Sequence, residues 1–214
     1  MFLSNSTPPW IRRLPLFWAS DCLLCGATGL PSLVCRPCEH SLPRPLSLPG
    51  EVTAAYSYDF PVDGLVHRFK FGRDLAVGHW LAGRLADRLA GCEPPDVLVV
   101  PPISRARLRE RGFNPALEIA RRVGRAVGAR VDVHGIERVR DTASQTGLDR
   151  QARRENLRGA FRCERDYRGL RIALVDDVFT TGATAEALGA LLRRQGAARV
   201  DVWVVARTPL PGGG

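Results

Sequence analysis

The sequence predicts an α/β fold built on a parallel sheet, and three observations support this class. First, from residue 51 onward short apolar runs alternate with segments of helical periodicity, which is typical of a sheet with helices on both faces. Second, three of the apolar runs are candidates for buried strands: Val97–Val100, Arg171–Val175 and Val200–Ala206. Third, arginines and carboxylates follow the first two of these strands, where open parallel sheets bind ligands.

Three helices are predicted around these strands: residues 75–90, 115–127 and 182–195. The first follows Asp74, whose side chain suits an N-cap, and it ends before Gly91. The second begins with Asn114 and Pro115, which suit the N-cap and the first helical position. The residues that precede it, PPISRARLRERGFN (101–114), are expected to form a basic loop.

Four of the six cysteines form two CxxC pairs: Cys22, Cys25, Cys35 and Cys38. Two such pairs separated by a short loop suit a tetrahedral, structural Zn²⁺ site of the knuckle or ribbon type. Two disulfides or a redox CxxC are the alternatives. Zinc is favoured because disulfides are rare in the cytoplasm and a redox motif needs only one pair. Cys92 and Cys163 have no partner in the sequence pattern.

The predicted organisation has a zinc module with a proline-rich linker at residues 1–49, a main domain at 50–209 and a flexible tail at 210–214. Prolines and arginines interrupt the apolar residues of the first twenty positions. No run approaches the roughly 20 apolar residues that a membrane span needs. We therefore expect a cytoplasmic chain without a membrane span.

The charge of the chain is basic, with 31 Lys+Arg against 22 Asp+Glu and a net charge of +9. Lys70 is the only lysine, so almost all of the positive charge is arginine. The guanidinium fork matches phosphate oxygens, which favours phosphate-bearing partners. Charge alone does not separate a nucleotide-like substrate from a nucleic acid.

The segment LVDDVFTTGATAEA (174–187) places two acids, Asp176 and Asp177, directly after a strand and before a Thr/Gly turn. The turn and the helix after it would present N–H and hydroxyl donors to a phosphate; its residues are Thr180, Thr181, Gly182, Ala183 and Thr184. Carboxylates repel phosphate but accept hydrogen bonds from vicinal hydroxyls and ligate Mg²⁺. A sugar phosphate satisfies both groups. A capping Asp followed by a Ser/Thr-type turn is the structural alternative.

This string resembles the binding motif for 5-phosphoribosyl 1-pyrophosphate (PRPP) in type I phosphoribosyltransferases. Four further features of the sequence are the paired CxxC motifs, HRFKFGRD, RERGFN and SQTGLDRQARRENLRGAF. With these motifs the chain resembles, from Cys22 to Arg207, the ComF family, which includes the GntX-type proteins. The resemblance implies a type I phosphoribosyltransferase fold behind an N-terminal zinc ribbon or knuckle. It also implies that Asp176 and Asp177 hold the ribose hydroxyls, that residues 180–184 hold the 5′-phosphate, and that Mg²⁺ accompanies PRPP.

The same resemblance suggests roles for three further segments. The pyrophosphate loop would contain Ser104, Arg105, Arg109, Arg111 and Gly112, with Arg107 among them. A mobile loop that closes over PRPP would carry Gln145, Arg153 and Asn156. Lys70 would lie near phosphate oxygens, and residues 51–74 would form the hood that selects the acceptor. The alternatives are solvated basic loops, or contacts with a nucleic-acid backbone.

Two classes of function follow from these patterns. In the first, a nitrogen nucleophile attacks Mg²⁺-bound PRPP and releases pyrophosphate. In the second, the fold is a scaffold that handles nucleic acid, because members of the family are associated with DNA uptake during competence. Single-stranded DNA or proteins of the competence machinery would then be its partners. A domain that senses PRPP without catalysis would combine the two.

Overall fold

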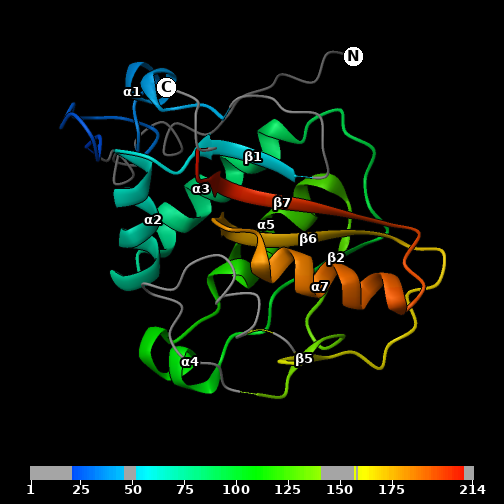
Figure 1. Ribbon diagram of the computed structural model, residues 1–214. Helices are drawn as coiled ribbons and strands as arrows, with labels where there is room; N and C mark the ends of the chain where they lie inside the picture. Colours follow the sequence, from blue (N-terminus) through cyan, green and yellow to red (C-terminus); the bar gives the residue numbers. More distant parts are fainter. Residues whose placement is uncertain (1–20, 46–51, 141–156, 158, 210–214) are drawn as a thin grey trace, which may run out of the picture. The chain divides into compact units, whose positions relative to one another are not determined.

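The computed structural model describes residues 21–45, 52–140, 157 and 159–209 (Figure 1). The chain divides into two compact units, Met1–Ser41 and Leu42–Gly214. The domain boundary predicted between residues 49 and 50 and the tail predicted at 210–214 both lie outside the described residues. Gln145, Arg153 and Asn156 also lie outside them, so the loop assigned to these three residues stays a prediction.

The first unit consists of turns followed by one short helix, α1 (Arg36–Ser41). Cys22 and Val34 are its buried side chains among the described residues. The backbone N–H of Cys22 donates to the carbonyl of Ala27, and that of Leu23 donates to Leu33. These bonds bring the two CxxC turns together in space.

The second unit is built on a five-stranded sheet in the order β1-β7-β6-β2-β3, and every neighbouring pair is parallel. The strands are β1 (Val52–Ser57), β2 (Val97–Val99), β3 (Arg130–Asp132), β6 (Arg171–Phe179) and β7 (Arg199–Arg207). The predicted parallel sheet is therefore confirmed. Residues 52–57, which were expected to belong to the hood, instead pair with β7 as an edge strand.

The helices of this unit are α2 (Val62–Phe71), α3 (Leu75–Arg88), α4 (Arg105–Arg111), α5 (Pro115–Val127) and α7 (Ala183–Arg194). Helices α3 and α5 pack side by side on one face of the sheet, and α7 covers the other (Figure 1). Both predicted caps are present, because Asp74 accepts from the backbone N–H of Val77 and Asn114 accepts from that of Ala116. Among the described helices, none combines the length and the hydropathy that a membrane span requires.

Residues 101–114 do not form the open loop that we expected. They contain α4, which begins after Ser104 and ends at Gly112. The hydroxyl of Ser104 accepts a hydrogen bond from the backbone N–H of Arg107 at 3.3 Å, which is an N-cap. Arginine is also a good helix former, so the basic run folds as one helix of seven residues.

Helix α2 packs tightly against α3 through a close contact between Phe69 and Gly78. The ring of Phe69 is 1% exposed, and a Cβ at Gly78 would overlap it. Its ring centroid also lies 5.4 Å from that of Phe113, just before α5. The last turn of α2, including Lys70, is thereby held in place over the carboxyl end of the sheet.

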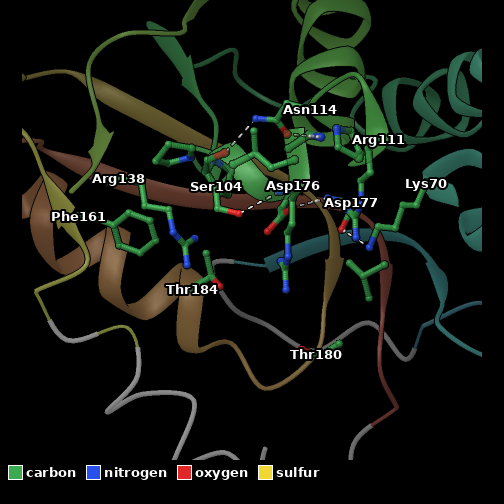
Figure 2. Close-up of a pocket in the computed structure, with 17 residues that line it drawn as sticks. Lys70, Ser104, Arg111, Asn114, Arg138, Phe161, Asp176, Asp177, Thr180 and Thr184 are labelled. Carbon is green, nitrogen blue, oxygen red and sulfur yellow. Dashed lines mark hydrogen bonds and ion pairs between the residues drawn. The ribbon is translucent and has the colours of Figure 1, made fainter. Parts of the chain in front are cut away.

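A second, two-stranded sheet lies apart from the main one. It pairs β4 (Glu137–Arg138) with β5 (Phe161–Arg162) in antiparallel fashion. These strands flank residues 141–156, which lie outside the described residues. The pair places the side chains of Arg138 and Phe161 beside the start of α7 (Figure 2).

Candidate functional site

A pocket of about 210 Å³ opens where β2 and β6 end. Its walls come from α2, α4, the start of α5, the β4–β5 pair and the beginning of α7 (Figure 2). It brings together eight of the residues predicted from the sequence: Lys70, Ser104, Arg107, Arg111, Asp176, Asp177, Thr180 and Thr184. A smaller cavity next to it is lined by the remaining residues of the Thr/Gly turn: Thr181, Gly182 and Ala183.

The two acids lie inside β6 rather than after it, because this strand continues to Phe179. Asp177 is buried, with 9% of its surface exposed, and Asp176 is partly buried. The backbone N–H of Asp177 donates to Oδ1 of Asp176 at 2.8 Å. Lys70 reaches the same place from α2, and its Nζ lies 2.9 Å from Oδ1 of Asp177.

The environment of Asp176 favours its protonated form. Burial is the largest cause and the neighbouring charge of Asp177 is the second, and together they raise the pKa of Asp176 to about 7. The ammonium of Lys70 acts in the opposite direction. A protonated carboxyl group can donate as well as accept a hydrogen bond, and a sugar hydroxyl can pair with either form.

The Thr/Gly turn has the backbone geometry of an anion site. Gly182 has φ of 80°, in the left-handed region, and a Cβ there would lie 2.7 Å from the ring of Phe179. Helix α7 starts at the next residue without a side-chain cap. The N–H of Ala183 donates to Oγ1 of Thr181 at 3.5 Å. The next N–H groups of the first turn have no intrahelical acceptors, which leaves them available to an anion. Thr180 and Thr184 add hydroxyl groups at the pocket wall.

Helix α4 presents two different faces. Arg107 and Arg111, one turn apart, line the pocket, whereas Arg105 and Arg109 are exposed and do not line it. Arg111 is partly buried, and its guanidinium carbon lies 4.7 Å from the ring centroid of Phe71. Its buried Nε has no hydrogen-bond partner among the described residues. A buried donor of this kind suits an anionic ligand.

Among the pocket residues that were not predicted as site residues are Arg138 and Phe161, which come from the β4–β5 pair. The guanidinium carbon of Arg138 lies 5.5 Å from the centroid of the Phe161 ring. The arginine-rich stretch that begins at Arg138 is the sequence feature that could have indicated this residue. Nothing in the local pattern separates Arg138 from its neighbouring arginines, because only the antiparallel pairing of β4 with β5 brings it to the pocket.

The four CxxC cysteines form a separate cluster in the first unit. Their sulfur atoms all lie within 4.8 Å of one another, and Cys25 Sγ is 3.7 Å from Cys35 Sγ. Zinc–sulfur bonds of about 2.3 Å in a tetrahedron give sulfur–sulfur distances of about 3.8 Å. The backbone N–H of Cys35 donates to Cys22 Sγ and lowers the pKa of that thiol to about 6. The cluster therefore fits the predicted zinc ion.

Comparison with known proteins supports these assignments of fold and family. Residues 107–210 match the family model described as the phosphoribosyl transferase domain. The chain is 34% identical over 219 residues to the DNA utilization protein YhgH of Escherichia coli O6:H1, covering 93% of this chain and 96% of that protein.

Two competence proteins are also similar to the chain. Competence protein F of Haemophilus influenzae is 35% identical over 161 residues, covering 70% of this chain and 69% of that protein. Competence protein ComFC of Bacillus subtilis is 28% identical over 198 residues, covering 87% of this chain and 78% of that protein. With its parallel sheet and its four-cysteine cluster, this protein belongs to the ComF family and carries a domain of the type I phosphoribosyltransferase class.

Proposed function

We propose that this protein binds a 5-phosphorylated ribose, with Mg²⁺-bound PRPP as the ligand, in the pocket at the end of β6. One observation carries the proposal: the acid pair and the Thr/Gly turn lie in a pocket whose other walls supply cations. Ribose hydroxyls would bind to Asp176 and Asp177, and the 5′-phosphate would bind at residues 180–184. The vicinal hydroxyls of the ribose explain why two acids lie in this pocket, because a ligand that was only an anion would be repelled by them.

The diphosphate of PRPP would lie towards α4. Ser104, Arg107 and Arg111 line that wall, and the unpartnered Nε of Arg111 offers a donor to a phosphate oxygen. The predicted roles of Arg105, Arg109 and Gly112 in diphosphate binding stay predictions. Mg²⁺ bound to the ribose and diphosphate oxygens would neutralise the charge of the leaving group.

The reaction that suits this arrangement is transfer of the phosphoribosyl group to nitrogen. The lone pair of the nitrogen attacks C1 of the ribose, the bond from C1 to the diphosphate oxygen breaks, and its electron pair leaves with pyrophosphate. The proton of the nitrogen passes to solvent. Arginines at the diphosphate would stabilise the negative charge that develops as this bond breaks.

A second candidate function is the handling of nucleic acid, with or without catalysis. The relatives named for competence and DNA utilization, together with the net charge of +9, favour it. Exposed arginines outside the pocket, such as Arg105, Arg109 and Arg122, are available to a phosphate backbone. Binding of single-stranded DNA should then weaken steeply as salt rises.

Calorimetry with Mg²⁺ and PRPP tests the first proposal, followed by a screen of nucleobases for release of pyrophosphate. Binding with pyrophosphate release supports a transferase, and binding without release supports a sensor. Lack of any binding by the zinc-loaded full-length protein would contradict both. A salt titration with single-stranded DNA then tests the second candidate, which undetectable or salt-independent binding would exclude.

A further inference from the structure

The acid pair of the pocket already has a cation of its own. The Nζ atom of Lys70 lies 2.9 Å from Oδ1 of Asp177, and only 18% and 12% of the two side chains are exposed (Figure 2). Lys70 is the single lysine of a chain that has 31 basic residues. The only lysine of the protein therefore lies against a carboxylate of the proposed sugar site.

The position of Lys70 is set by the packing of α2. The neighbouring residue, Phe69, is buried against Gly78 and Phe113, so the last turn of α2 cannot rotate without losing this contact. Lys70 also stands where the C-terminal end of the helix dipole favours a positive charge. The ammonium is thus directed at Asp177 before any ligand arrives.

Two adjacent carboxylates on one strand repel each other, and they usually attract a divalent cation such as Mg²⁺ or Mn²⁺. Here the ammonium of Lys70 supplies one positive charge at a distance typical of a direct ion pair. A divalent ion that approached Asp177 would have to displace this ammonium. The contact consequently disfavours a metal ion on the protein carboxylates themselves.

We propose that Lys70 is a positioning residue that serves as the resident counter-cation of the acid pair. It holds Asp177 in place and keeps divalent ions off both carboxylates, so that the acids bind sugar hydroxyls. The divalent ion then enters only with the diphosphate of the ligand. The binding of a sugar, as this inference uses it, rests on the proposed function. The exclusion of divalent ions from the acid pair is a property of the protein without ligand.

The test is a Mn²⁺ titration of the zinc-loaded full-length protein without sugar. The electron paramagnetic resonance signal of free Mn²⁺ measures how much of the ion is bound. The wild-type protein should bind Mn²⁺ only weakly. Lys70→Gln should bind it at least tenfold more tightly, because Asp177 then loses the cation that lies against its Oδ1. The double variant Lys70→Gln/Asp177→Asn should lose this gain, which assigns the new ion to the acid pair.

Arg68→Gln is the matched control, because it removes one positive charge from the same helix, where Arg68 pairs with Asp74 at 2.8 Å. Its affinity for Mn²⁺ should equal that of the wild type, and Lys70→Arg should also keep the weak affinity. Lys70→Met is a second neutral variant if Lys70→Gln does not fold. Unchanged Mn²⁺ affinity in the folded neutral variants, or an equal gain in Arg68→Gln, would overturn the proposal.

Failure of this inference can be distinguished from failure of the proposed function. Ribose 5-phosphate has no diphosphate, so its binding to the zinc-loaded wild type should be the same with and without added Mg²⁺. If the wild type does not bind ribose 5-phosphate or PRPP, the proposed function fails. The Mn²⁺ result still decides the role of Lys70.

Discussion

The hydroxyl group of Tyr167 donates a hydrogen bond to Oδ2 of Asp132 at 2.8 Å, and both residues are buried. This bond ties the end of β3 to the segment that leads into β6. Burial alone would raise the pKa of Asp132. The bonds from Tyr167, His134 and Gly135, with the charge of Arg165, instead hold that pKa below its usual range. The Asp132 carboxylate is therefore a buried anion, and its hydrogen-bond donors stabilise the charged form.

We expect Tyr167→Phe to lower the free energy of unfolding by about 1–3 kcal/mol, because it leaves the Asp132 carboxylate with one donor fewer. Urea denaturation measures the change. Tyr58→Phe is the matched control, since the Tyr58 hydroxyl has no hydrogen-bond partner among the described residues. Equal stability of the two variants would show that the bond to Asp132 contributes nothing.

Asp176 should make stability depend on pH. Its pKa is raised from 3.8 to about 7, so between these values the folded protein holds a proton that the unfolded chain has released. Stability should therefore fall as the pH rises through this window. Asp176→Asn, which keeps an acceptor for the N–H of Asp177, should be about 1–3 kcal/mol more stable than the wild type at pH 8.

Near pH 4 the two proteins should differ by less than about 1 kcal/mol, because folded Asp176 is then protonated and the unfolded chain is close to its own pKa of 3.8. Asp87→Asn is the control, since Asp87 is an exposed partner of Arg84. It should change stability by less than about 1 kcal/mol at either pH. A wild-type protein that is as stable as Asp176→Asn at pH 8 would contradict the raised pKa.

Two glycines near the same helix should respond in opposite ways to alanine. Gly182→Ala places a Cβ 2.7 Å from the Phe179 ring at a left-handed residue, which should cost more than about 1 kcal/mol and weaken phosphate binding. Gly189→Ala lies within α7, where the nearest atom would be 3.4 Å away. It should stabilise the helix by about 0.5–1 kcal/mol. Thermal unfolding of both variants measures the contrast, and a stable Gly182→Ala that binds ligand normally would contradict this account of the turn.

The two faces of α4 should differ in their effect on ligand binding. Arg111→Gln should weaken the binding of Mg²⁺-bound PRPP at least tenfold in calorimetry, because Arg111 lines the pocket with an unpartnered donor. Arg105→Gln should have a smaller effect, since Arg105 is exposed outside the pocket. Arg122→Gln on α5 is the control for loss of charge. If all three variants weaken binding equally, the overall charge rather than the pocket is responsible.

The cysteine cluster should hold one zinc ion per chain. Cys38→Ser removes one of the four sulfur ligands and should abolish stoichiometric zinc binding. Cys92→Ser should retain it, because Cys92 is exposed and lies outside the cluster. Elemental analysis of the purified proteins measures the zinc content. Equal zinc content in the two variants would exclude the four-cysteine site.

Local patterns were sufficient to predict the centre of the site but not its walls. Asp176, Asp177 and the Thr/Gly turn are close in sequence, so a strand followed by a helix is enough to bring them together. The partner of Lys70 is distant in sequence, and the prediction placed Lys70 near a phosphate rather than beside Asp177. Arg138 reaches the pocket only through the pairing of β4 with β5. The strand at 52–57 was missed because its pairing with β7 joins opposite ends of the domain.

The central place of β6 has a consequence for the dynamics of the protein. Its backbone is hydrogen-bonded to β7 on one edge and to β2 on the other. Lys70, Arg111 and Arg138 reach the pocket from elements outside the five-stranded sheet. A molecule that contacted all of them would act as a cross-link between the sheet and its periphery. Amide hydrogen exchange should accordingly slow in α2, α4 and the β4–β5 pair when the pocket fills, while β6 is protected from the start.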